Sequence, residues 1–159
     1  MKFVPESVID TIVEALENTP EDAEDILLEL NERQPALAPF VLSNNEGSFD
    51  EGEEAFLLYL LLVIWRSHEQ VNGPQPPIEP EALEGAEENN WELLEQLPPT
   101  VKKFRERLDV LFAASTQEDL LAFVEDALLG DEDGDDLPVT REGREPIFVI
   151  MKTVVDCLG

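Results

Sequence analysis

The carboxylates between Asp131 and Glu142 have the clearest chemical potential in this sequence. The stretch reads Asp-Glu-Asp-Gly-Asp-Asp-Leu-Pro-Val-Thr-Arg-Glu. Carboxylate oxygens are the ligands that hard cations such as Ca²⁺ prefer in proteins. The stretch is therefore the first candidate for a binding site, and its residue types indicate a divalent cation as the ligand.

The same twelve residues resemble the calcium-binding loop of the EF-hand family. That loop carries oxygen ligands at positions 1, 3 and 5 and a bidentate Glu at position 12. The matching positions hold Asp131, Asp133, Asp135 and Glu142, and we expect helices on both sides of them. The resemblance covers this loop alone, and it implies a calcium site made by these four side chains.

The loop departs from the EF-hand pattern where the geometry of that pattern is tight. Position 6 is normally Gly but is Asp136 here, and position 8 is Pro138, which has no N–H to donate. A second window, from Leu42 to Glu53, has Gly47, Phe49 and Glu53 at the offsets of positions 6, 8 and 12 but Leu at its first ligand position. Partial matches are expected by chance in a chain this acidic. We therefore interpret residues 131–142 as a solvated acidic connector and keep calcium binding as the alternative.

Four of the ten cationic residues lie close together, in a helix for which Thr100 is the predicted cap. They are Lys102, Lys103, Arg105 and Arg107. Such a cluster could dock a phosphate or a partner that carries carboxylates. The interpretation we prefer is that it neutralises neighbouring acidic helices, because a cationic cluster has a larger effect in a strongly negative field.

The sequence contains no recognisable catalytic motif. His68 is the only histidine, and Cys157 is the only cysteine and lies far from it in the chain. This pair predicts neither a nucleophilic dyad nor a zinc site. Glycine-rich phosphate loops and nucleophile elbows are also absent from the sequence. We expect a protein that is not an enzyme and that has no cofactor other than a possible calcium ion.

The elements that would position these residues are predicted to be helices. Apolar residues recur at helical spacing along most of the chain, and no segment alternates long enough to predict a strand. The uninterrupted apolar run from Ala55 to Trp65 indicates a helix, at about residues 53–71, that is contacted on all sides. The predicted fold is an all-α bundle of about eight helices packed around this central helix.

The length of the chain favours a single domain over residues 1–159. A proline-rich connector at about residues 73–80 is expected to join two helical halves, because successive prolines exclude a helix. One cysteine gives no sign of an oxidising compartment, and we find neither a leader peptide nor an apolar run long enough to span a membrane. A cytoplasmic location is the expectation.

The charge of the chain narrows the classes of partner. Ten Lys and Arg against thirty-seven Asp and Glu give a formal net charge of −27. Nucleic acids and anionic membranes are disfavoured, since binding to either depends on cationic side chains. The hydrophobic fraction of 43% is that of an ordinary globular chain, so disorder is not indicated.

Three explanations of this charge remain open. The protein could be an interaction or adaptor module whose acidic surface meets a basic protein partner. It could bind a divalent cation through the acidic loop. The acidic surface could also reflect solubility in high salt, with no role in function. We favour the interaction module, which predicts an apolar groove or patch bordered by acid. The sequence does not indicate the oligomeric state.

Overall fold

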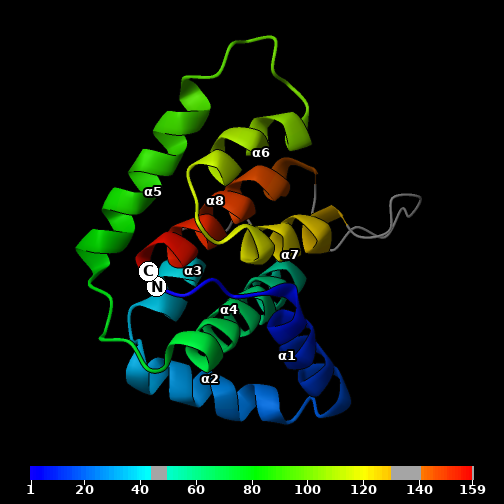
Figure 1. The fold of residues 1–159 in the computed structure, drawn as a ribbon, viewed down its shortest axis with the longest axis vertical. Helices are drawn as coiled ribbons and strands as arrows, with labels where there is room; N and C mark the ends of the chain where they lie inside the picture. The colour runs from blue at the N-terminus through cyan, green and yellow to red at the C-terminus, as the bar shows by residue number, and fades with distance from the viewer. Residues whose placement is uncertain (44–49, 130–140, 159) are drawn as a thin grey trace.

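The computed structural model describes residues 1–43, 50–129 and 141–158, and within them the fold is all-α with eight helices and no strand. This confirms the predicted fold class. Figure 1 shows the arrangement of the helices, whose bounds are α1 Glu6–Asn18, α2 Asp22–Arg33, α3 Leu37–Ser43, α4 Glu51–Asn72, α5 Pro80–Glu95, α6 Phe104–Ala113, α7 Glu118–Leu129 and α8 Arg141–Leu158.

Helix α4 lies at the centre of the first half of the fold. Every residue from Leu60 to Trp65 is buried, and α1, α2, α3 and α8 all pack against this helix. Its start is fixed by a capping box in which the Glu53 backbone N–H donates to Asp50 Oδ1 at 2.8 Å and the Asp50 N–H donates to Glu53 Oε1 at 3.2 Å. The long apolar run therefore predicts the central helix correctly.

Helix α8 is a second central element, which the sequence analysis did not single out. Residues 147–155 are all buried, and α3, α4, α5 and α7 pack against α8. Phe148 of α8 stacks on Phe112 of α6 with ring centroids 5.8 Å apart. The core is thus organised by α4 and α8 together.

Residues 73–79 contain no helix, and α5 starts at Pro80. Buried Gln34, just after α2, holds this connector: the Ile78 N–H donates to Gln34 Oε1 at 2.8 Å, and Gln34 Nε2 donates to the Pro76 carbonyl at 2.9 Å. Helix α5 then runs along one side of the molecule and packs against α8 and α6 (Figure 1).

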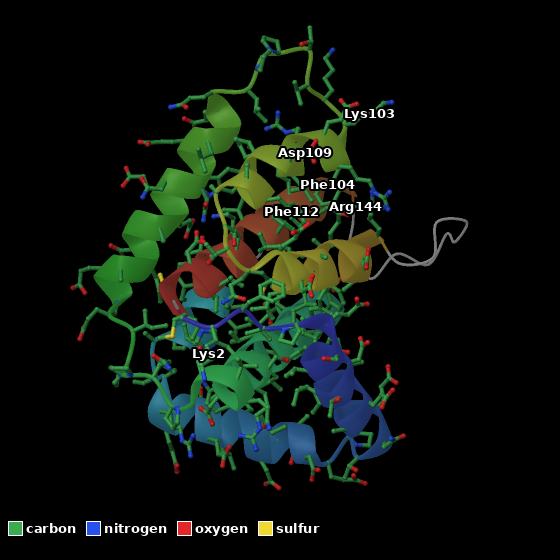
Figure 2. All side chains as sticks on the ribbon, in the orientation of Figure 1. Lys2, Lys103, Phe104, Asp109, Phe112 and Arg144 are labelled. Atoms are coloured by element: carbon green, nitrogen blue, oxygen red, sulfur yellow. The ribbon has the colours of Figure 1, made fainter. Side chains whose placement is uncertain are left out.

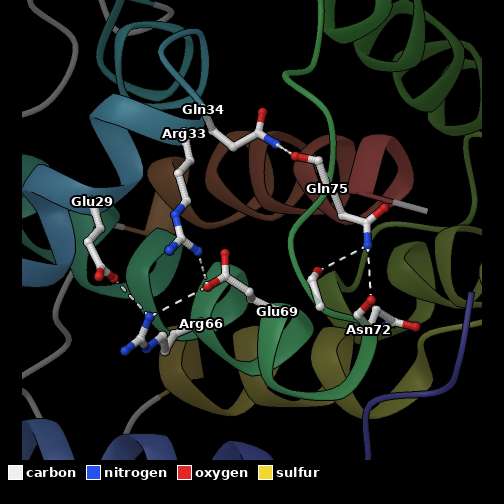
Figure 3. Close-up of polar contacts among 8 residues, drawn as sticks. Glu29, Arg33, Gln34, Arg66, Glu69, Asn72 and Gln75 are labelled. Carbon is white, nitrogen blue, oxygen red and sulfur yellow. Dashed lines mark hydrogen bonds and ion pairs between the residues drawn. The ribbon is translucent and has the colours of Figure 1, made fainter.

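A chain of ion pairs joins α2 to α4 (Figure 3). Arg33 Nη1 lies 2.6 Å from Glu69 Oε1, and Arg66 Nη1 lies 2.9 Å from Glu29 Oε2 and 3.6 Å from Glu69 Oε1. These side chains are partly exposed, so each pair contributes about 0–1 kcal/mol. Two of the ten cationic residues of the chain, Arg33 and Arg66, are thereby paired with acidic residues along α2 and α4.

The start of α1 is fixed to α7 across a long sequence separation. The Val4 N–H donates to Oε1 of buried Gln117 at 2.9 Å, and the Glu6 N–H donates to Asp119 Oδ2 at 2.9 Å. Helix α1 has no side-chain cap of its own, since its N-cap residue is Pro5. Asp119 therefore supplies the acceptor that the first turn of α1 needs.

One predicted helix start is wrong. Helix α6 begins at Phe104 with Lys103 as its N-cap residue, three residues beyond the predicted position of the first turn after Thr100. Lys102 and Lys103 consequently precede the helix, and only Arg105 and Arg107 lie within it. The basic cluster is not a single helical face.

Candidate functional site

A mostly apolar hollow lies between α1, α2 and α4, and we call it the apolar groove. It has a volume of about 350 Å³, and its apolar lining residues are Leu16, Pro20, Ala23, Leu27, Ala55, Leu58, Tyr59 and Leu62. The remaining two lining residues are carboxylates, Glu17 and Glu24, and both are exposed. An apolar hollow with an acidic border is the feature that the interaction hypothesis predicts.

A second hollow, which we call the acidic hollow, lies between α1 and α7. Its volume is about 410 Å³. Four of its lining residues are carboxylates and four are apolar: Glu6, Asp10, Asp119, Asp126, Ile9, Ala122, Phe123 and Ala127. The hydrogen bond from Glu6 to Asp119 fixes the distance between the two helices at this point. The hydrogen bond that caps α1 thus also fixes the spacing of the two helices that line the acidic hollow.

The phenol of Tyr59 lies in a partly buried and negative environment within the apolar groove. Burial raises the pKa of Tyr59 above its ordinary value, and the carboxylate of Glu17 raises it further. The phenol therefore stays neutral at neutral pH and offers one O–H donor at the border of an apolar surface.

Three of the four candidate calcium ligands, Asp131, Asp133 and Asp135, lie outside the described residues. Glu142 lies in the first turn of α8, and its side chain is also outside the described set. Calcium binding by the loop therefore stays a prediction. In the second window, the carboxylate of Glu53 accepts a hydrogen bond in the capping box of α4. Among the described residues, no group of three or more His, Cys, Asp or Glu side chains has an arrangement that could hold a metal ion.

The basic residues of α6 contact acidic neighbours on other helices. Arg107 Nε forms an ion pair with Glu145 of α8. Burial raises the pKa of Glu125 on α7, and the nearby charge of Arg105 opposes that rise. Figure 2 shows the region around Lys103 and Phe104, where the Arg144 guanidinium lies 6.0 Å from the Phe104 ring centroid. Arg107 is therefore paired with an acidic residue of another helix, and the charge of Arg105 acts on Glu125 of α7.

His68 and Cys157, the other candidate reactive groups, are placed unfavourably for catalysis. His68 is only 1% exposed, its Nε2 atom has no hydrogen-bond partner, and burial lowers its pKa. Burial and the neighbouring Asp156 raise the pKa of Cys157 to about 11, so its thiol is protonated at neutral pH. The Cys157 thiol donates to the Ala82 carbonyl of α5 at 3.5 Å. Both side chains act in helix packing.

The structure also contains a buried polar cluster between α5 and α8 that the sequence analysis missed. Lys152 is 2% exposed, and its Nζ donates to Asn90 Oδ1 at 2.9 Å and to Asp156 Oδ2 at 2.8 Å. The Asn90 amide donates to Asp156 Oδ2 at 3.1 Å and to Thr153 Oγ1 at 3.2 Å. Because these groups satisfy one another, the cluster joins the two helices rather than presenting a reactive lysine.

The residues of the apolar groove were visible in the sequence, but only as parts of separate stripes. Apolar residues at helical spacing, such as Leu16, Ala23 and Leu27, usually face the core of a helical protein. In the structure Leu16 is buried, Ala23 and Leu27 are only partly buried, and all three line a hollow that is open to solvent. Periodicity identifies an apolar face but does not indicate whether another helix covers it.

Comparison of the chain with known protein families, with curated proteins and with solved structures found no significant match. Of the helices that the structure describes, none is long and apolar enough to cross a membrane.

Proposed function

We propose that this protein is a non-enzymatic interaction module that binds a basic protein partner through the apolar groove between α1, α2 and α4. The observation that carries the proposal is the composition of that groove. Eight of its ten lining residues are apolar, the other two are Glu, and neither Lys nor Arg lines it. A hollow of this kind suits a partner that inserts apolar side chains and carries positive charge beside them.

The chemistry of the described side chains supports binding over catalysis. A general acid or base must reach a substrate, and buried His68 does not. A nucleophilic cysteine needs a lowered pKa, whereas that of Cys157 is raised. These side chains therefore support binding of a partner at the surface better than they support catalysis.

A display selection on random peptides of about 18 residues, long enough for five helical turns, tests the proposal. The bait is the wild-type protein, and the selected peptides are then titrated against two variants. Ala55→Trp places an indole in the apolar groove at an exposed position, whereas the control Ala15→Trp places one on an exposed position of α1 that does not line it.

We expect the selected peptides to carry apolar residues at helical spacing together with Lys or Arg. Ala55→Trp should weaken their binding about tenfold or more, and Ala15→Trp should leave it unchanged. The proposal is wrong if no peptide is enriched, or if the enriched peptides bind Ala55→Trp as tightly as wild type.

A further inference from the structure

The two hollows open along the same flank of α1. Glu6 and Asp10 line the acidic hollow near the start of the helix, and Glu17 lines the apolar groove near its end. Residues four and seven positions apart share a helix face, and these three carboxylates follow one another at spacings of four and seven. Helix α1 therefore forms a common wall for both hollows.

An aromatic pair lies between the two hollows. Tyr59 of α4 lines the apolar groove, Phe123 of α7 lines the acidic hollow, and their ring centroids are 6.5 Å apart at an interplanar angle of 57°. Both rings are partly buried and pack against the core. Their ring contact joins one apolar lining residue of each hollow.

The chemistry changes from one hollow to the other. Four carboxylates line the hollow near the start of α1, whereas eight apolar residues line the groove near its end. No Lys or Arg lines either hollow, so nothing among their lining residues neutralises the acid. A partner that covers both hollows must therefore bring cations to one end and apolar side chains to the other.

We propose that the acidic hollow and the apolar groove form one two-part site for a helical segment of a partner protein, with an apolar stripe and a cluster of Lys or Arg at one end. This inference rests on the proposed function and specifies the partner. The Lys or Arg cluster lies against Glu6, Asp10 and Asp126, and the apolar stripe lies against α2 and α4.

A helix is the form of partner that the surroundings favour. The described residues contain no strand, so they offer no sheet edge to an extended peptide. The wall made by the 13 residues of α1 is about 20 Å long, which matches about four helical turns of a partner. A second copy of this chain is disfavoured as the occupant, because each copy carries a net charge of −27.

Synthetic helical peptides of about 18 residues test the position of the charge. All have the same composition and the same leucine stripe. In the first peptide three lysines lie at the N-terminal end, in the second they lie at the C-terminal end, and in the third they are spread evenly. Binding is measured by fluorescence anisotropy at about 0.05 M and about 0.5 M NaCl, where screening lengths differ severalfold.

Two protein variants of equal charge change provide the comparison. Asp10→Asn with Asp126→Asn removes two exposed carboxylates from the acidic hollow. Glu84→Gln with Glu88→Gln removes two exposed carboxylates from α5, which lies on the other side of the molecule (Figure 1). Because both double variants reduce the net charge equally, any difference between them is local.

We expect one of the two end-clustered peptides to bind about fivefold more tightly than the evenly spread one at low salt. Asp10→Asn with Asp126→Asn should abolish this advantage, whereas Glu84→Gln with Glu88→Gln should retain it. High salt should reduce the advantage for the wild-type protein. Equal binding of all three peptides, or equal effects of the two double variants, would overturn the two-part site. If Ala55→Trp still abolished binding in that case, the proposed function would stand without it. A dimer that Ala55→Trp dissociates would assign the groove to a second copy and overturn the inference.

Discussion

Several polar side chains in this molecule hold backbone segments in place through hydrogen bonds. Gln117 accepts from the Val4 N–H and donates to the Lys2 carbonyl, and Gln34 does the same for the connector before α5. Glu53 caps α4. Each contact spares a backbone group the cost of losing its hydrogen bond with water, about 1–3 kcal/mol for a buried group. These residues are structural, and the sequence alone did not distinguish them from the many exposed polar residues of the chain.

His68 should make the stability of the protein dependent on pH. Burial lowers the pKa of His68 in the folded state, so the unfolded chain binds its proton at a higher pH than the folded protein does. The contribution of neutral His68 is present above pH ~6.5 and is lost as the pH falls below the pKa of the unfolded chain.

Urea unfolding of wild type and His68→Leu between about pH 7.5 and pH 5 measures this contribution. Wild type should lose stability relative to the variant by up to about 1.4 kcal/mol per pH unit in the lower part of this range. Comparison with the variant removes the effect of the many carboxylates, which both proteins share. Parallel stability curves over the whole range would show that His68 titrates alike in both states.

At the scale of elements, the sequence predicted the existence of the helices better than their starts. The number of helices follows from apolar periodicity, and the central position of residues 60–65 follows from the uninterrupted apolar run that contains them. The starts depend on tertiary contacts that periodicity does not contain. Asp119 of α7 supplies the acceptor at the start of α1, and α6 starts later than Thr100 suggests. A cap supplied by another helix leaves no local signal.

The buried polar cluster between α5 and α8 was also unpredictable from local sequence. Lys152 and Asn90 are 62 positions apart, and Lys152 lies within a helix whose apolar stripe does not include it. A lysine is rarely buried unless its ammonium is paired. Here both Asn90 and Asp156 accept from it, so burial became possible only through the packing of α5 on α8.

Removal of Asp156 should therefore destabilise the protein more than removal of Lys152. Asp156→Ala leaves a buried ammonium without its carboxylate, at an expected cost of about 2–4 kcal/mol. Lys152→Met leaves a carboxylate that is 28% exposed and can be hydrated, so its expected cost is about 1–2 kcal/mol. Urea denaturation measures both.

Asp109→Ala provides the control, because Asp109 is exposed on α6 and its removal changes the net charge as Asp156→Ala does. It should change stability by no more than about 0.5 kcal/mol. Equal losses of stability for Asp156→Ala and Lys152→Met would contradict a buried polar cluster that depends on pairing of the ammonium.

At the scale of the whole molecule, the chain has a net charge of −27, and most of the acidic side chains that the structure describes are exposed around an apolar interior. Mutual repulsion of these charges destabilises the folded state, and salt should weaken the repulsion. The melting temperature should therefore rise with NaCl. CaCl₂ and MgCl₂ at matched ionic strength should raise it equally if residues 131–142 are a solvated connector. A rise specific to calcium would contradict that interpretation and favour the EF-hand-like alternative.

The candidate site is formed only by the packing of several helices. Its walls come from α1, α2, α4 and α7, all of which carry apolar residues at helical spacing or, in α4, an uninterrupted apolar run. The gaps between the stripes are set by how the helices cross, including the fixed contact between Glu6 and Asp119. The acidic surface was predictable from composition, whereas the position of an uncovered apolar groove within it required the three-dimensional arrangement.

The affinity of a selected peptide for wild type, Ala55→Trp and Ala15→Trp is the most direct test of binding through the apolar groove. Only the first of these substitutions fills the groove, and both residues are exposed, so the two should fold equally well. Binding through the apolar groove predicts a loss of about tenfold or more for Ala55→Trp and none for Ala15→Trp. Unchanged affinity for Ala55→Trp, or equal losses for both variants, would contradict it.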